Sequence, residues 1–393
     1  MWIRTLLTTR PFPHTPRGRH LYHELSFHSR GKPSNVLHYV QKDRVDDAGG
    51  PPSENHVGID MLYAPLNPAD VNTIEGSYPK PLDLQTHRSR FTHGAIVAGS
   101  EGIGRVRISG SGPFEKGDLV IAGMPGMGTM RSFIWAPASS LLPVPLKGVE
   151  LFNQQQQDAG AVLSMLPQLG GTALRMLQDF QPEGAVIQNA GNSAVGFMAS
   201  QLAHLMNRDM ISVVRRGDKT EKDFKALCEY LKTKGKCSVV VAEEDLTYAE
   251  SVMAFKESIK IFQPHLEVKN ILPMLALNAV GGESASLLGK ILEPNGTMVT
   301  YGGMAKKPVI VSTGQLIFKN IKYLGYWHSR WMTQHTYEEK KEMMETLIDH
   351  LFERRIACPP FQEFSLANFQ DALLFDSSQS GLRRKVVFKC QED

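Results

Sequence analysis

The segment Gly191–Gly196, written GNSAVG, has the residue types of a turn that binds phosphate. It lies between the apolar strand pattern AVIQNA and a helical pattern, so it joins the end of a strand to the start of a helix. Backbone N–H groups at a helix start attract anions such as a pyrophosphate, and small side chains let the backbone approach it. A turn without a ligand needs the same small residues, and the sequence is not GxGxxG. The turn by itself therefore leaves nucleotide binding and a plain structural turn both open.

Two arginines at the end of the next strand pattern indicate which nucleotide fits. Arg215 and Arg216 close the run MISVVRR, and the nearest carboxylate, Asp218, comes only after them. An acidic residue about 20 positions past the glycines binds the ribose hydroxyls of NAD, whereas a basic residue accommodates the 2′-phosphate of NADP. Two solvated arginines are common in any protein, but after a phosphate-type turn they favour NADPH.

Alternating strand and helix patterns surround this turn and must position it. The strand patterns are residues 185–190, 210–216, 237–244, 274–280 and 296–303, and the helical patterns are residues 159–177 (with a break), 194–206, 223–235 and 284–292. Strands separated by helices imply right-handed βαβ units and a doubly wound parallel sheet of the Rossmann type. We therefore assign residues 166–315 to an α/β dinucleotide-binding domain.

The chain before this domain has a different texture. Short strand-like runs interrupted by Gly and Pro occupy residues 56–66, 102–112, 118–123, 131–137 and 141–145. They predict an irregular, mostly β domain over residues 21–165. The tail from Tyr323 has mixed character, so we expect residues 316–393 to return to this first domain.

Composition excludes several classes of protein. Lys and Arg number 43 against 40 Asp and Glu, which gives no reason to expect a nucleic-acid surface. The four cysteines are scattered without a CxxC, so neither a disulfide framework nor a structural zinc site is indicated, and a reducing compartment fits. No apolar run reaches the roughly 18 residues that a membrane-spanning helix requires.

The N-terminus is basic and lacks acidic residues. No Asp or Glu occurs before residue 24, and the segment carries Arg4, Arg10, Arg17 and Arg19. This composition predicts a mitochondrial transit peptide over residues 1–20, and hence a matrix protein. A disordered basic tail is the alternative, because prolines from Pro11 onward confine any helix to the first few residues.

Motifs along nearly the whole chain beyond the leader point to one family. They are LNPADVNTIEGSYP (66–79), GSEGIGRV (99–106), KGDLVI (116–121), GMGTMRSF (126–133), VIQNAGNSAVG (186–196), LNAVGG (277–282), GTMVTYGGMAKKPV (296–309) and IFKNIKYLGYWHSRW (317–331). In these segments the chain resembles the zinc-independent medium-chain dehydrogenases/reductases, and within them the mitochondrial trans-2-enoyl thioester reductases. The resemblance implies a GroES-like catalytic domain beside the Rossmann domain. It also implies NADPH-dependent reduction of enoyl thioesters, carried by acyl carrier protein or coenzyme A, in mitochondrial fatty acid synthesis by a homodimer.

Zinc-dependent relatives differ at two positions of these motifs. They carry Cys where Asn67 stands and His where Ser100 stands, and neither residue here is a suitable zinc ligand. We therefore expect no metal, and a substrate carbonyl polarised by hydrogen bonds instead.

The resemblance also assigns site residues. Tyr78 is implied as the donor to the reacting substrate, since a neutral phenol can donate a hydrogen bond or a proton. Trp327 is implied to line the pocket and place Tyr78 or the substrate. The residues expected at the cofactor are Asn192, Ser193, Ala194, Val195, Arg215, Arg216, Gly217, Tyr301, Gly302, Gly303, Met304, Tyr326, His328 and Arg384.

The chain departs from the family at two places, which keeps other functions open. Ala194 stands where the family commonly has Gly, which adds a methyl group beside the pyrophosphate. Leu169-Gly170 stands where the family has Asn-Pro, so a polar contact to the cofactor or substrate is expected to be lost. A catalytically weak NADPH-binding protein is therefore one alternative. A zinc-independent quinone oxidoreductase, which needs no Tyr78, is the other.

Overall fold

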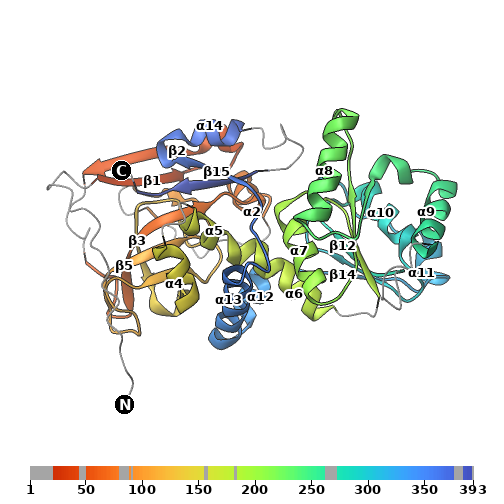
Figure 1. Cartoon of the computed structure of the whole chain (residues 1–393). Helices are drawn as coiled ribbons and strands as arrows, with labels where there is room; N and C mark the ends of the chain where they lie inside the picture. Colours follow the sequence, from red (N-terminus) through yellow and green to blue (C-terminus); the bar gives the residue numbers. More distant parts are fainter. Residues whose placement is uncertain are drawn as a thin grey trace, which may run out of the picture.

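The computed structural model describes residues 21–43, 50–78, 88–89, 92–154, 158–180, 184–261, 272–375 and 384–391. Figure 1 shows a β-rich lobe built from the N-terminal and C-terminal parts of the chain, beside an α/β lobe built from the middle part. The predicted transit peptide, residues 1–20, lies outside the described residues. In the part of the chain that is described, no helix has the length and apolarity needed to span a membrane.

The α/β lobe holds a six-stranded sheet in which every strand pair is parallel. In spatial order its strands are β11 (Val239–Ala242), β10 (Met210–Val214), β9 (Ala185–Gln188), β12 (Pro273–Asn278), β13 (Thr297–Thr300) and β14 (Lys322–Gly325). This is the 3-2-1-4-5-6 order of dinucleotide-binding folds, so the predicted Rossmann sheet is confirmed. The helices of the lobe are α6 (Gly171–Asp179), α7 (Ala194–Leu205), α8 (Glu221–Thr233), α9 (Ala249–Ile261), α10 (Gly282–Ile291) and α11 (Thr313–Ile317).

The last strand of this sheet corrects the predicted domain boundary. We expected the chain to leave the α/β domain at residue 315, but β14 pairs with β13 from Lys322 to Gly325. The strand was missed because it is a short edge strand whose side chains are mostly exposed, so it lacks the continuous apolar run of the central strands.

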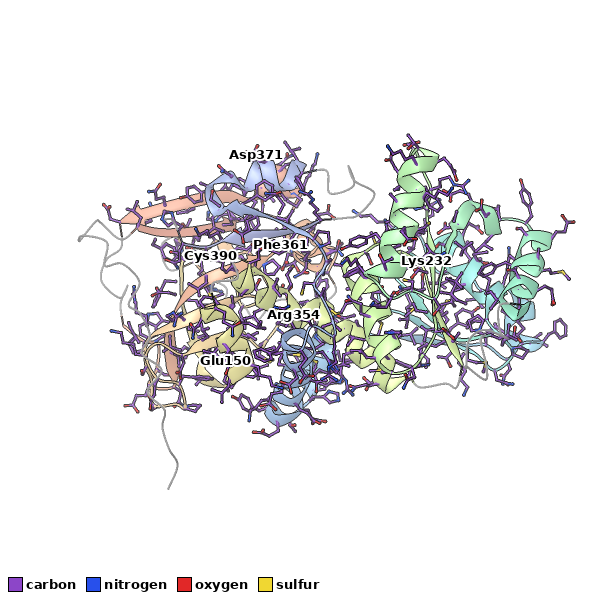
Figure 2. The ribbon with its side chains drawn as sticks, in the orientation of Figure 1. Glu150, Lys232, Arg354, Phe361, Asp371 and Cys390 are labelled. Atoms are coloured by element: carbon purple, nitrogen blue, oxygen red, sulfur yellow. The ribbon has the colours of Figure 1, made fainter. Side chains whose placement is uncertain are left out.

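The β-rich lobe contains the ends of the chain. Its larger sheet has seven strands, β15 (Phe361–Ser365), β16 (Lys385–Lys389), β3 (His56–Pro65), β5 (Ile103–Ile108), β6 (Leu119–Ala122) and β8 (Leu141–Pro143) in order, with β7 (Phe133–Pro137) also paired to β3. A smaller sheet consists of β2 (His38–Asp43), β1 (Leu21–Phe27) and β4 (Ile96–Val97). Figure 2 shows Phe361 and Cys390, near the C-terminus, in the same lobe as Glu150. The mostly β first domain is confirmed, and the last strands of the chain complete its sheet.

The remaining helices belong to this lobe or to the junction of the lobes (Figure 1). They are α1 (Pro33–Val36), α2 (Pro68–Glu75), α4 (Leu146–Asn153), α5 (Ala159–Met165), α12 (His328–Gln334), α13 (Tyr337–Phe352) and α14 (Phe369–Leu374). The predicted break in the helical pattern 159–177 is a π-helical turn, Leu166–Gly170, between α5 and α6. Pro167 explains the break, because proline has no N–H to continue an α-helix.

Candidate functional site

Helix α2 sets the position of Tyr78. Asn67 caps its start, Pro68 occupies the first turn, and the side chain of Asp70 accepts the Asn67 backbone N–H at 2.8 Å. Gly76 ends the helix in the left-handed conformation, with φ of 83°, which glycine adopts without strain. The N–H of Tyr78 then donates to the Asn72 carbonyl at 3.1 Å. The backbone of Tyr78 is thus tied to the end of α2.

Tyr78 meets the segment that follows β14. The indole Nε1 of Trp327 donates to the Tyr78 hydroxyl at 2.6 Å, and the two rings contact edge to face with centroids 5.8 Å apart. Ser329 Oγ lies 3.0 Å from the same hydroxyl. Both Tyr78 and Trp327 are half-buried. The structure therefore brings together the two residues predicted as catalytic, from positions far apart in the chain.

The small-residue turn follows β9 directly, as the sequence pattern indicates. Ser193 caps α7, and its side chain accepts the N–H of Gly196 at 3.2 Å. Gly191 admits no side chain, since a Cβ there would lie 2.6 Å from Ser212 of β10. Gln188 holds the turn from below, because its Nε2 donates to the Gly196 carbonyl and to Ser212, each at 2.9 Å. The turn is thus preformed, with helix N–H groups directed outward.

The two arginines after β10 differ in their surroundings. Arg216 pairs with Asp245 at 3.0 Å and lies over the Phe224 ring, whereas Arg215 is exposed. The backbone N–H groups of Arg216 and Gly217 donate to the carboxylate of Glu244 at 3.0 and 3.1 Å. The sheet places all of these residues beside the turn, because parallel strands end at one edge.

A third predicted segment, Tyr301–Met304, follows β13 at the same edge of the sheet. Burial raises the pKa of the Tyr301 phenol, and the nearby Ser193 hydroxyl works in the opposite direction. A Cβ on Gly303 would meet no atom within 4 Å, so the backbone there is open to an approaching group. Met304 is 42% exposed. These residues come together with the turn.

An ion pair joins this loop to the first domain. Lys306, just past Met304, pairs with Glu75 of α2 at 3.2 Å. The loop after β13 and the helix that precedes Tyr78 therefore lie side by side.

Three of the predicted cofactor residues have side chains that bond to other parts of the protein. Tyr326 and His328 are buried and hydrogen-bonded to each other at 2.9 Å, so their side chains are occupied by packing. Burial lowers the pKa of His328 to about 4. Arg384 is exposed and donates to Gln362 of the first domain at 3.5 Å. The structure does not bring the Arg384 guanidinium to the turn or to Tyr78.

The residue after Arg384 lies in a buried polar cluster that the sequence did not predict. Lys385 Nζ donates to Asn67 Oδ1, and Asn67 Nδ2 donates to Glu101 at 2.8 Å. Ser100 donates to Asp70 at 2.5 Å. Burial raises the pKa of Glu101 to about 8 and lowers that of Lys385, and the attraction between the two groups opposes both shifts.

This cluster includes the two positions at which zinc-dependent relatives carry metal ligands, Asn67 and Ser100. Here both side chains bond to carboxylates, and the positive charge at the centre belongs to Lys385. Among the residues that the structure describes, no group of three or more His, Cys, Asp or Glu is arranged to hold a metal ion.

The structure also shows the surroundings of the two positions at which this chain differs from the family. Leu169 is 2% exposed in the π-helical turn and belongs to the main hydrophobic core. Ala194 is the first residue of α7 and is half-buried. Leu169 thus contributes apolar packing where the family has a polar residue.

Sequence reasoning missed Ser329, Asp70, Glu101 and Lys385. Ser329, Asp70 and Glu101 lie within the motifs GYWHSRW, NPAD and GSEG, and Lys385 directly follows Arg384, so the available signal was a single hydroxyl or charge. Only the packing of distant segments shows which of these side chains meet.

Comparison with protein families and relatives gives consistent results. A model of the alcohol dehydrogenase GroES-like domain matches residues 53–146. A Bos taurus protein named mitochondrial enoyl-(acyl-carrier-protein) reductase is 36% identical over 362 residues, covering 88% of this chain and 87% of the relative. Its Mus musculus counterpart is 37% identical over 354 residues, covering 89% and 84%.

Solved structures share the architecture. The complex of Etr1p with NADP and crotonyl-CoA is 28% identical, with a TM-score of 0.78 and coverage of 94% of this chain and 99% of that chain. A putative NADPH:quinone reductase from Bacillus thuringiensis is 21% identical, with a TM-score of 0.71 and coverage of 94% and 99%. At that identity the second structure shows a common fold alone.

Proposed function

The chain belongs to the family of mitochondrial enoyl-(acyl-carrier-protein) reductases, and we propose that Tyr78, held by Trp327, is the residue that protonates its substrate. The protein is a mitochondrial, NADPH-dependent enoyl thioester reductase. The observation that carries the proposal for Tyr78 is the 2.6 Å hydrogen bond from the Trp327 indole to the phenol oxygen.

The chain's own groups suit the second half of the reduction. When bound, NADPH supplies the hydride that forms the new C–H bond at Cβ of the enoyl thioester. Negative charge then develops on the thioester oxygen, and a hydrogen-bond donor directed at it lowers the barrier. The indole N–H can only donate, so it occupies a lone pair of the Tyr78 oxygen and leaves the phenol O–H to be given away. The Tyr78 O–H bond breaks as the C–H bond at Cα forms, which completes the saturated acyl chain.

The residues at the carboxyl edge of the sheet fit a dinucleotide. The turn Asn192–Val195 offers helix N–H groups for a pyrophosphate, and the open backbone at Gly303 allows a flat ring to approach. Arg215 is the exposed cation beside this turn. Among the predicted cofactor residues, we therefore propose that the side chain of Arg215 holds the 2′-phosphate.

Arg215→Ala should raise the KM for NADPH by about 10- to 100-fold, the effect of losing a hydrogen bond to a charged group. The KM for NADH should change little, because NADH has no 2′-phosphate. Arg216→Ala is the matched control, and its effect should be smaller because Arg216 is already paired with Asp245. Steady-state rates with both cofactors measure the ratio. Equal losses with NADH and NADPH would show that Arg215 does not recognise the phosphate.

The choice of substrate distinguishes the proposed function from the two alternatives. A quinone oxidoreductase would oxidise NADPH with quinones and leave crotonyl-CoA unreacted, and a weak NADPH-binding paralogue would reduce neither. We expect rapid NADPH oxidation with crotonyl-CoA, despite the apolar Leu169. Comparing the same acyl chain on coenzyme A and on acyl carrier protein then tests our proposal that the carrier protein is a substrate in mitochondrial fatty acid synthesis.

The edge strand β14 supports the proposal of a homodimer. In the described sheet β14 pairs with β13 alone, and exposed apolar residues lie within it or shortly before it in the chain: Leu316 (51%), Ile317 (65%), Phe318 (83%) and Leu324 (45%). An unpaired edge with such a patch is unusual in a monomer, and a two-fold axis would pair two such edges. The related Etr1p/Etr2p protein of Candida tropicalis is a heterodimer.

Phe318→Glu should convert the protein from dimer to monomer, because it buries a charge in each half of the interface. Sedimentation equilibrium measures the mass. Tyr248→Glu, at a 73% exposed residue of the far edge of the sheet region, is the control. A monomeric wild-type protein would contradict the dimer.

Residues 1–20 are proposed to direct import into the matrix. Fusing them to a reporter protein tests this directly, and a reporter that stays in the cytosol would contradict it.

A further inference from the structure

We propose that Ser329 is a positioning residue that holds the phenolic hydrogen of Tyr78 and returns a proton to the phenol oxygen after each reduction. The inference rests on the proposed role of Tyr78 as proton donor. It adds a residue and a route for proton resupply, since a donor that has given up its proton must be recharged before the next cycle.

The hydrogen-bond inventory of the Tyr78 hydroxyl carries this inference. Trp327 Nε1 is a donor only, so it cannot accept the phenolic hydrogen. Among described residues, the other hydrogen-bond partner of the hydroxyl is Ser329 Oγ, at 3.0 Å. Ser329 Oγ is therefore the described protein atom that can accept the Tyr78 O–H in the resting protein. A serine hydroxyl both donates and accepts, so it can reverse the direction of this bond when the phenol loses its hydrogen.

The local fold keeps these partners in place. Trp327 is the N-cap of α12 and Ser329 lies in its first turn, so one short segment supplies both partners of the phenol. The helix is anchored from its other side by Trp331 and Met332, which are 5% and 2% exposed. Ser329 itself is half-buried, which leaves its hydroxyl within reach of solvent. A proton relay needs a hydroxyl that is held in place by the fold and is also accessible to water. Ser329 on the anchored helix α12 meets both conditions.

The proposed step balances. Tyr78 gives its proton to Cα of the substrate and becomes a phenolate. The Ser329 O–H proton moves to the phenolate as a water molecule gives a proton to Ser329 Oγ, leaving hydroxide in solvent. The two transfers are concerted, because a free serine alkoxide is too basic to form on its own. One proton is taken from water in each cycle, and Ser329 is unchanged at the end.

The test compares Ser329→Ala with Ser329→Thr in crotonyl-CoA reduction. Ser329→Ala should lower kcat by about 10- to 100-fold, the effect of removing a hydrogen bond to a charged group, and leave KM for crotonyl-CoA unchanged. Its solvent deuterium isotope effect on kcat should rise, because proton delivery becomes slower. Ser329→Thr keeps the hydroxyl and should restore both. Ser258→Ala, which removes a hydroxyl bonded within α9, is the matched control and should change neither.

A double-variant cycle separates this inference from the role of Tyr78. In the Tyr78→Phe background, Ser329→Ala should cause no further loss, because the group it serves is gone. A full extra loss there, an unchanged isotope effect in Ser329→Ala, or equal losses in the Ala and Thr variants would overturn the inference. If Tyr78→Phe is fully active, the proposed function of Tyr78 fails instead. If Ser329→Ala unfolds, Ser329→Cys replaces it, since its weak S–H donor should show the same pattern.

Discussion

Tyr78→Phe is expected to lower kcat for crotonyl-CoA reduction by about 10²- to 10⁴-fold, which is the usual contribution of a positioned proton donor. The substitution removes the hydroxyl that accepts the Trp327 N–H and keeps the ring that contacts the indole edge. The loss should therefore fall on the chemical step and not on folding. KM for NADPH should stay unchanged, because the predicted phosphate contacts lie on the other domain. Steady-state NADPH oxidation measures both constants.

The matched control is Tyr248→Phe, which removes a hydroxyl from a side chain that is 73% exposed. Its kcat should equal that of the wild-type enzyme. Tyr78→Phe that keeps wild-type kcat would exclude Tyr78 as the proton donor, whatever the geometry of its hydrogen bonds. A Tyr78→Phe variant whose KM for NADPH also rises would indicate a general defect in cofactor binding.

The architecture of the α/β domain could be predicted because its signals are local. Buried parallel strands read as apolar runs, so β9, β10, β12 and β13 were all expected at nearly their observed positions. The edge strand β14 was missed because it has four residues that are mostly exposed, so it lacks a continuous apolar run. The order of the central strands follows from the connectivity of the chain. Whether an edge strand forms depends on the neighbouring segments of the folded protein.

Some residues of the candidate site can likewise be predicted from local sequence, and others cannot. The turn at Gly191 and the cations at Arg215 and Arg216 are read from residue type and spacing, because the strand-turn-helix geometry of the fold fixes them. Tyr78 has no local pattern, since it is one aromatic residue after a helix. Its role was implied only by family resemblance, and its meeting with Trp327 depends on how two domains pack. No property of the isolated segment contains that information.

The position of Lys385 could not be predicted from the sequence either. The sequence offers Arg384 and Lys385 side by side, and the resemblance selected Arg384. The structure turns the two side chains in opposite senses: Arg384 is exposed, while Lys385 reaches Asn67 inside the protein. Arg384 precedes β16, whereas Lys385 is the first residue of that strand. The position of Lys385 is set by the pairing of β16 with β3, which joins the two ends of the chain.

The ammonium of Lys385 favours the charged forms of Asp70 and Glu101, which burial disfavours. Asp70 and Glu101 are 2% and 1% exposed, and burial raises the pKa of both. Hydrogen bonds from Ser100 and Asn67 satisfy their oxygens but bring no charge. Removing the partner of a buried polar group leaves that group unsatisfied and costs its desolvation penalty. The cluster is therefore stable as a set and sensitive to the loss of its cation.

Lys385→Met is expected to lower the free energy of unfolding by about 1–3 kcal/mol, the typical cost of leaving a buried hydrogen-bond acceptor, here Asn67 Oδ1, unsatisfied. Methionine keeps the apolar stem, so the loss reports the ammonium group and not a cavity. Lys232→Met is the matched control, since Lys232 is exposed on α8 (Figure 2) and a surface substitution should change stability by less than about 0.5 kcal/mol. Urea unfolding measures the wild-type protein and both variants, and a Lys385→Met variant as stable as Lys232→Met would show that the cluster does not need this side chain.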